Sequence, residues 1–177
     1  MLRGSKFFST IDLKNGYYQV AIKESDRCKT AFTSPSVLFQ FRRMPFGLCN
    51  APATFQNLMN IILKKHIGKF CYVYIDDIII YSDSFEDHCK HLELIISTLV
   101  SAGLCINSTK SKIFCTSIKF LGHVISQNGI GTDPMKIQVI THWPPPKSKR
   151  ELQQFLGLCS YYRRYFPNFS MFHLYTN

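Results

Sequence analysis

The sequence lacks the features of a secreted or membrane-spanning protein. It contains seven cysteines, but they are odd in number and form no Cys-x-x-Cys pair, which argues against a disulfide framework and indicates a reducing compartment. No secretory leader is recognisable at its start, and no uncharged apolar run is long enough to cross a bilayer. We therefore expect an intracellular protein that is not secreted and has no membrane partner.

Internal repeats and low-complexity segments are missing too, so we expect neither a repeat array nor a segment of biased composition. Hydrophobic residues make up 46% of the 177 residues, which is enough to build a core and argues against disorder. The length suits one domain, or one domain with part of another.

Acidic residues are scarce, with 11 Asp and Glu against 21 Lys and Arg, and six of the acids lie within residues 76–93. The ranges 1–75 and 94–177 are both strongly basic, so an acidic centre lies between basic arms. A polyanion held by the arms with a metal ion at the centre fits this pattern. A solvated basic surface fits it equally well.

Apolar spacing and turn signals predict an α+β fold, an antiparallel sheet backed by two helices. Strands are predicted over residues 7–13, 29–33, 37–42, 70–75, 78–81 and 117–125, with a further turn at 128–129. Helices are predicted to begin at the caps Asn50, Ser84, Asp133 and Ser148. Residues 17–22 fit a strand or a short helix, and the run 144–147 is a candidate linker.

The most unusual stretch is the pair Asp76-Asp77, which separates two strand-like apolar runs and is predicted to form their hairpin turn. Two adjacent carboxylates beside a hydrophobic sheet are costly unless a cation neutralises them. Asp12 follows another strand and would come within reach if the strands were neighbours, about 4.8 Å apart. Three such oxygen donors suit two Mg²⁺ or Mn²⁺ ions acting in phosphoryl transfer. An exposed strand-end acid remains an equal alternative for Asp12.

Eight short sequence motifs follow one another along the chain: 8–13 (FSTIDL), 29–32 (KTAF), 44–48 (MPFGL), 50–56 (NAPATFQ), 74–77 (YIDD), 120–125 (FLGHVI), 155–158 (FLGL) and 161–164 (YYRR). Together they resemble the reverse transcriptase of gypsy-class LTR retrotransposons, a relative of retroviral polymerases. The resemblance covers nearly the whole chain.

The resemblance implies an RNA-directed DNA polymerase that extends a DNA primer on an RNA or DNA template. Residues 1–130 would form the palm, a ferredoxin-like antiparallel sheet backed by helices, with the fingers largely missing. Residues 131–177 would begin the helical thumb. The implied partners are template-primer, deoxynucleoside triphosphates and the remainder of a Pol polyprotein, namely fingers, RNase H and integrase. The implied location is a retroelement particle in the cytoplasm, or the nucleus.

The resemblance also implies roles for residues around the acids. Asp12, Asp76 and Asp77 match the metal-binding catalytic carboxylates, with the carbonyl of Leu13 as a further ligand. Lys110 matches a lysine near the leaving pyrophosphate, a candidate general acid. On the residues alone, Lys110 is a solvated surface lysine.

For the nucleotide, the resemblance implies backbone amide contacts from Asn15 and Gly16 and a steric gate at Tyr17 that favours deoxynucleotides. Phe46 would lie in the loop over the nucleotide, and the pair Leu121-Gly122 would grip the primer end. Without the resemblance, Tyr17 and Phe46 are more simply core aromatics.

Alternatives remain at three places. His88 and His91 share a helix face and suggest zinc, but no second ligand pair follows at finger spacing. Residues 161–166 mix aromatics with arginines, which suits either a nucleic-acid surface or a helix with one buried face. The whole chain could be an inactive remnant that only binds nucleic acid, whereas a nucleotide cyclase would need glycines before Asp76.

Overall fold

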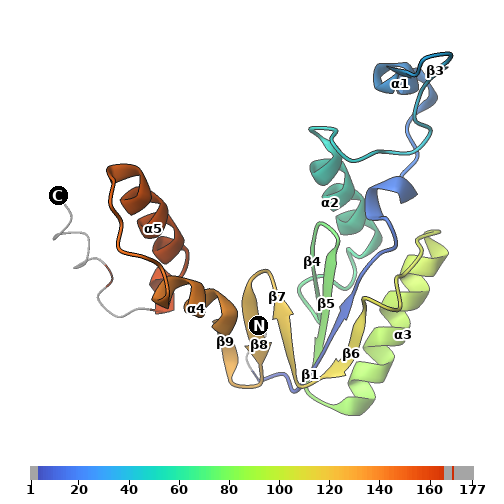
Figure 1. Cartoon of the computed structure of the whole chain (residues 1–177). Helices are drawn as coiled ribbons and strands as arrows, with labels where there is room; N and C mark the ends of the chain where they lie inside the picture. Colours follow the sequence, from blue (N-terminus) through green and yellow to red (C-terminus); the bar gives the residue numbers. More distant parts are fainter. Residues whose placement is uncertain (1–3, 166–168, 170–177) are drawn as a thin grey trace.

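A four-stranded antiparallel sheet organises the fold, in the order β4-β5-β1-β6 (Figure 1). The computed structural model describes residues 4–165 and 169. The strands are β1 (Phe7–Ile11), β4 (Cys71–Tyr74), β5 (Asp77–Ser82) and β6 (Lys112–Cys115). Strand β1 pairs antiparallel with both β5 and β6, so residues distant in sequence meet at the centre. The predicted α+β class with an antiparallel sheet is confirmed.

Helices α2 (Ala51–Ile62) and α3 (Phe85–Ser101) cover one face of this sheet. Their buried side chains follow helical spacing and pack onto Ile78 and Ile80 of β5. Ser84 caps α3 as predicted, because its side chain accepts a hydrogen bond from the N–H of Asp87. Asn50 is the N-cap residue of α2 as predicted, but among the described residues its side chain makes no capping hydrogen bond.

A second sheet of β7 (Ser117–Phe120), β8 (His123–Ser126) and β9 (Gly129–Thr132) packs against the other face. Ile118 and Ile125 contact Phe8, Ile79 and Tyr81 in this second cluster. Side chains alternate between faces along a strand, so both faces of β5 are buried. The uninterrupted apolar run 78–81 is the sequence signature of that double burial.

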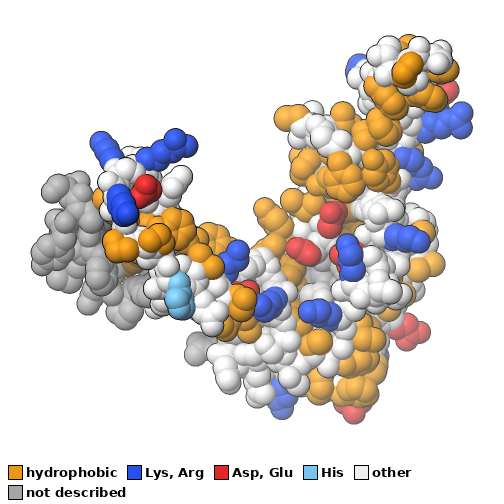
Figure 2. Space-filling model, viewed as in Figure 1, with side chains coloured by type: hydrophobic (Ala, Val, Ile, Leu, Met, Phe, Trp, Pro, Cys, Tyr) orange, Lys and Arg blue, Asp and Glu red, His pale blue; other side chains and the backbone are white. Residues whose placement is uncertain are grey.

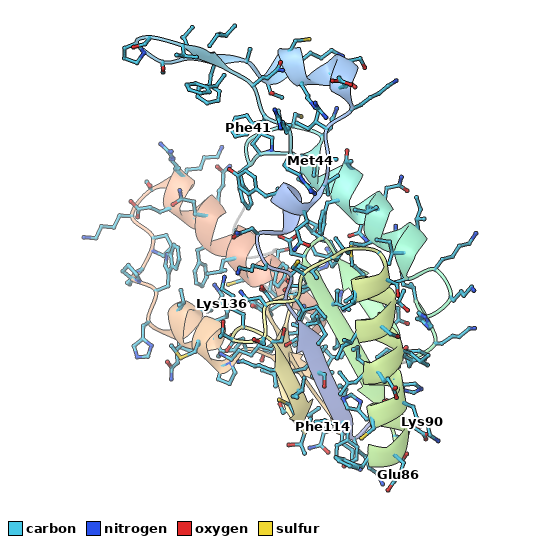
Figure 3. All side chains as sticks on the ribbon, turned by 90° about the vertical axis from the view of Figure 1, so that its right-hand side faces the viewer. Phe41, Met44, Glu86, Lys90, Phe114 and Lys136 are labelled. Carbon is cyan, nitrogen blue, oxygen red and sulfur yellow. The ribbon has the colours of Figure 1, made fainter. Side chains whose placement is uncertain are left out.

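The segment between β1 and α2 projects away from the sheets (Figure 1). It contains the helical turn η1 (Gly16–Gln19), which agrees with the short-helix alternative for residues 17–22. It also contains α1 (Glu24–Arg27) and η2 (Cys28–Thr30), which were not predicted. The predicted strands 29–33 and 37–42 shorten to β2 (Phe32–Thr33) and β3 (Leu38–Phe39). Both are exposed, so no core contact lengthens them. Figure 3 places Met44 near the base of this segment, far from Phe114 and Glu86.

The last helices, α4 (Pro134–Thr141) and α5 (Lys149–Tyr161), form an arm beside the sheets and end in η3 (Arg163–Tyr165) (Figure 1). Asp133 and Ser148 cap them as predicted, each accepting a backbone N–H. The proline run separates α4 from α5. Within the described part of the chain, no helix combines the length and apolarity that a membrane span requires.

Two differences from the predicted elements concern the later strands. Strand β6 was not predicted, and its pairing with β1 is entirely non-local. The predicted strand 117–125 is divided by a turn at Leu121-Gly122 into β7 and β8. The predicted turn near 128–129 then joins β8 to β9.

Candidate active site

The turn between β4 and β5 carries the acidic pair, one residue out of the predicted register. Tyr74 pairs with Asp77, so the two turn residues are Ile75 and Asp76. The prediction that Asp76-Asp77 form the turn is therefore wrong by one position. Asp77 is the first residue of β5, and Asp76 alone occupies the turn with Ile75.

Ile75 adopts a positive φ of 54°, which is unfavourable for a β-branched residue and costs about 1–3 kcal/mol. Gln56 of α2 supports this conformation. Its Oε1 accepts the Ile75 N–H at 2.6 Å, while its Nε2 donates to the Val73 carbonyl at 3.4 Å. Helix α2 therefore dictates the shape of the acidic turn. Sequence reasoning missed Gln56, whose only signal is its place at the end of the run 50–56.

Asp12 reaches the same end of the sheet from β1. Ile11 pairs with Ile78, so continuing the register by one residue sets Asp12 opposite Asp77. The Asp12 N–H donates to Ser111 Oγ at 3.0 Å, and its carbonyl accepts the Asn107 N–H at 2.8 Å. The loop that precedes β6 is thereby fastened to Asp12. Lys110 lies in this loop and is exposed.

The three carboxylates interact electrostatically. Burial raises the pKa of Asp76, and the negative charges of Asp12 and Asp77 raise it further. Burial and Asp12 likewise raise the pKa of Asp77. The Oδ1 atom of Asp76 is buried and has no hydrogen-bond partner among the described residues. Figure 2 shows acidic side chains gathered near the middle of this face with Lys and Arg side chains beside them.

The carboxylates of Asp12, Asp76 and Asp77 suit a divalent cation that is coordinated partly by the protein and partly by a bound ligand. In the described part of the chain, no three His, Cys, Asp or Glu side chains converge closely enough to hold a metal ion by themselves. Mg²⁺ is usually held by one or two carboxylates together with substrate phosphates and water, not by an all-protein cage. A divalent cation bound here would neutralise the repulsion between the three acids. It would also give the buried Asp76 Oδ1 atom a partner.

Gly16 lies directly against Asp76. A Cβ atom on Gly16 would stand 2.6 Å from Asp76 Oδ1, closer than real Cβ contacts. Asn15 just before it is left-handed, with φ 54° and ψ 44°, and opens the 3-10 turn η1. The absence of a side chain at position 16 therefore leaves room for the carboxylate.

Tyr17 joins the acids to the core. Its ring lies 5.0 Å from that of Phe46 and 5.5 Å from that of the fully buried Phe55. Burial raises the Tyr17 pKa, and the nearby Asp76 charge raises it further. Phe46 itself is 59% exposed. Tyr17 is thus both a core aromatic and a neighbour of Asp76, so the two interpretations of Tyr17 are compatible.

A known protein family matches most of the chain. The family described as "Reverse transcriptase (RNA-dependent DNA polymerase)" matches residues 1–125. The chain belongs to the reverse transcriptase family.

Among relatives of this reverse transcriptase chain, the retrovirus-related Pol polyprotein from transposon opus of Drosophila melanogaster is 46% identical over 96% of the chain. The corresponding polyprotein from transposon gypsy is 40% identical over 94% of the chain. The chain spans only 17% and 16% of these two relatives.

Solved structures agree with the sequence relatives. A foamy viral protease-reverse transcriptase in complex with double-stranded DNA matches 94% of the chain at a TM-score of 0.87 and 34% identity. A foamy viral protease-reverse transcriptase in complex with an RNA/DNA hybrid matches 94% at a TM-score of 0.81 and 34% identity. The chain covers 29% and 22% of those two chains, respectively.

The structure does not bring every predicted site residue of the chain to one place. Asp12, Asp76 and Asp77 meet with Gly16 and Tyr17. Leu13 directly follows Asp12, and its side chain is buried in the core. Leu121 and Gly122 lie elsewhere, in the turn between β7 and β8 of the second sheet.

The two histidines that suggested zinc serve another purpose. Ser82 Oγ lies 2.8 Å from Nδ1 of His88 and 2.7 Å from Nδ1 of His91, and Ser9 Oγ lies 2.7 Å from Nε2 of His88. Both ring nitrogens of the buried His88 are therefore occupied, and no Cys or His ligand cluster accompanies it in the described residues. His88 joins α3 to β1 and β5 and does not form part of a zinc site.

Proposed function

We propose that this chain forms the palm (residues 1–130) and the start of the thumb (residues 131–177) of an RNA-directed DNA polymerase. It would extend a DNA primer on an RNA or DNA template. The observation that carries the proposal is the meeting of Asp12 with Asp76 and Asp77 at one end of the β1–β5 pair.

Reverse transcriptases generally use divalent metal ions. Asp12, Asp76 and Asp77, with the carbonyl of Leu13, would hold two Mg²⁺, or Mn²⁺, ions. Bound there, the ions supply the charge that activates the attacking primer oxygen and stabilises the leaving pyrophosphate. The acids would hold fixed positions around the ions. Asp77 begins β5, Asp12 directly follows the paired strand β1, and Asp76 lies in a turn that Gln56 constrains.

The incoming deoxynucleoside triphosphate would lie along η1. Asn15 and Gly16 would present backbone N–H groups to its phosphates. Tyr17, braced against Phe46 and the core, would exclude a ribose 2′-hydroxyl. Lys110, in the loop fastened to Asp12, would donate a proton to the pyrophosphate.

The Leu121-Gly122 turn would hold the primer end, and the basic arms would bind the template-primer backbone. The foamy viral structures were determined with DNA and with an RNA/DNA hybrid, which supports this choice of partner. Relatives several times longer support a place within a Pol polyprotein that also supplies fingers, RNase H and integrase. We propose an intracellular location, in a cytoplasmic retroelement particle or in the nucleus.

A primer-extension assay on an RNA template tests the proposal. We expect extension by the wild-type chain with Mg²⁺ and a loss of at least 100-fold in Asp76→Asn. Asp83→Asn, which follows the other end of β5 and keeps an acceptor for Ser5, is the matched control and should extend normally. Equal extension by the wild type and Asp76→Asn would reject the catalytic assignment. Template binding without extension in all variants would favour the inactive remnant.

A further inference from the structure

The turn between β7 and β8 holds an unfavourable conformation. It consists of Leu121 and Gly122, which join the paired residues Phe120 and His123. Leu121 has φ 49° and Gly122 has φ 77°. Two-residue turns with positive φ at both positions favour Asn-Gly, because a leucine there is strained. Gly122 adopts its conformation easily, whereas Leu121 needs support from outside the hairpin.

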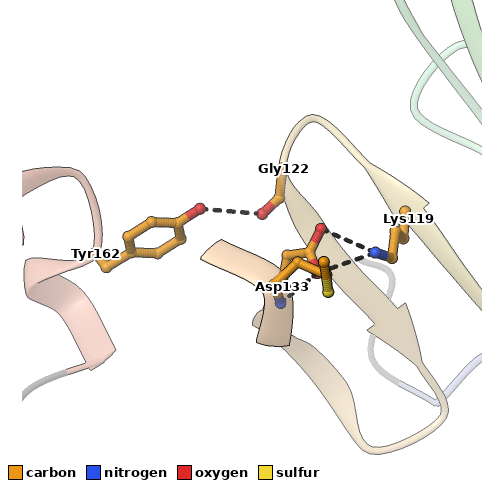
Figure 4. A network of polar contacts seen from close by, with 5 residues as sticks. Lys119, Gly122, Asp133 and Tyr162 are labelled. Atoms are coloured by element: carbon orange, nitrogen blue, oxygen red, sulfur yellow. Dashed lines mark hydrogen bonds and ion pairs between the residues drawn. The ribbon is translucent and has the colours of Figure 1, made fainter. Parts of the chain in front are cut away.

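That support comes from the end of α5. The Tyr161 hydroxyl donates to the Leu121 carbonyl at 3.0 Å. The Tyr162 hydroxyl donates to the Gly122 carbonyl at 3.4 Å, as Figure 4 shows. Two consecutive tyrosines thus hold two consecutive turn carbonyls. Tyr162 is 2% exposed, so its hydroxyl is committed to this contact and is not available at the surface.

The residue after the turn is held by the same cluster. The His123 ring stacks on Tyr161, with centroids 5.7 Å apart and an interplanar angle of 11°. Its Nδ1 lies 3.2 Å from the Tyr165 hydroxyl. The turn carbonyls are therefore held by Tyr161 and Tyr162, whereas Tyr165 contacts only His123, the first residue of β8.

A second contact, in strand β7, connects the hairpin to the arm formed by α4 and α5. Lys119 Nζ of β7 lies 3.0 and 3.1 Å from the carboxylate oxygens of Asp133 (Figure 4). Asp133 in turn caps α4 by accepting the Met135 N–H. Both α4 and α5 are thus connected to one hairpin, and a displacement of the arm would be transmitted to its turn.

We propose that Tyr161 and Tyr162 are positioning residues that fix the Leu121-Gly122 turn, so that the end of α5 determines where this turn holds a primer terminus. The inference rests on the proposed polymerase function, because only that function gives the turn a primer to hold. It also bears on the two interpretations of residues 161–166, of which 166 lies outside the described residues. Tyr162 is buried, Tyr161 is 55% exposed although its hydroxyl bonds to the hairpin, and Arg163 and Arg164 are exposed.

Steady-state primer extension on an RNA template tests the proposal, using the chain with a labelled DNA primer. In the double variant Tyr161→Phe/Tyr162→Phe, two hydrogen bonds are lost while both rings remain. We expect KM for the template-primer to rise about tenfold, as two neutral hydrogen bonds predict, with less than twofold change in KM for the deoxynucleotide. Tyr165→Phe removes a hydroxyl from the same cluster but frees neither turn carbonyl, so its template-primer KM should stay within twofold.

Hydrogen exchange provides a readout that does not depend on catalysis. The amides of residues 121–123 should lose protection at least fivefold in the double variant, and Leu121→Asn in that background should restore it, because Asn-Gly suits the turn. Unchanged exchange in the double variant overturns the proposal, and so does a deoxynucleotide KM that rises as much as the template-primer KM. A wild-type chain that never extends a primer rejects the polymerase function itself, while exchange still reports whether the tyrosines fix the turn.

Discussion

Replacing Gln56 with methionine should separate activity from stability. The hydrogen bond from the Ile75 N–H to Gln56 Oε1 contributes about 1 kcal/mol, and the positive φ that it supports costs about 1–3 kcal/mol. Without this hydrogen bond, Ile75 can leave the positive-φ conformation, and the strain energy of that conformation is then released. We therefore expect the free energy of unfolding of Gln56→Met to fall by no more than about 1 kcal/mol.

Activity should respond far more strongly, because Asp76 is the other residue of that turn. A misplacement of about 1 Å in a catalytic group costs on the order of 100-fold in rate. We expect Gln56→Met to lower kcat for primer extension by roughly that factor, since relaxation at Ile75 moves the Asp76 backbone. Urea unfolding and primer extension on the same protein samples measure the two effects.

Two further variants make the Gln56 test specific. Gln153→Met makes the same substitution at an exposed position of α5 and should change neither property. Ile75→Gly adopts a positive φ without strain, so adding Gln56→Met to it should cost less activity than in the wild type. The reasoning is refuted if Gln56→Met loses several kcal/mol of stability but keeps its kcat, or if the two substitutions are additive in activity.

Other predictions follow from the titratable groups and the close contacts. Burial and His91 lower the pKa of His88 to about 4; as pH falls the unfolded state therefore binds a proton first, and the free energy of unfolding should fall by roughly 2–3 kcal/mol between pH 7.5 and 4.5. Urea unfolding at several pH values should show this slope in the wild type and not in His88→Gln. Because the pKa of Asp76 is raised, its charge destabilises the metal-free fold as pH rises through that pKa. Asp76→Asn should then melt higher than the wild type at pH 7 in EDTA, and Mg²⁺ with a deoxynucleotide should narrow the gap. Gly16→Val should reduce primer extension at least tenfold by displacing Asp76, whereas Gly131→Val, whose Cβ meets nothing nearer than 3.9 Å, should not.

Local signals predicted most of the elements that lie around the core. The capping side chains of Ser84, Asp133 and Ser148 were recognisable because each bonds a backbone N–H two or three residues away. The apolar run 78–81 was recognisable as a buried strand because both faces of β5 are covered. The adjacent carboxylates of Asp76 and Asp77 beside an apolar strand likewise predicted the candidate metal site from residue type alone.

Non-local contacts account for what the sequence did not reveal. The turn register failed because a residue of α2, Gln56, supports a conformation that Ile75 disfavours by itself. Strand β6 was missed because it is mostly exposed and depends on pairing with β1, about a hundred residues earlier. The division of 117–125 at Leu121 was missed for the same reason as the acidic turn, since tyrosines of α5 hold it.

The central position of β1 has a consequence for the order of folding. Ser9 of β1 hydrogen-bonds to His88, 79 residues away, and to the N–H of Phe114, 105 residues away. Contacts of such separation form slowly, because long loops must close first, whereas the β4–β5 hairpin is local and can form within microseconds. During synthesis β1 must therefore wait, unpaired, until β5 and later β6 have emerged. Asp12 meets Asp76 and Asp77 only once β1 has paired with β5, so the proposed metal site would be completed late in folding.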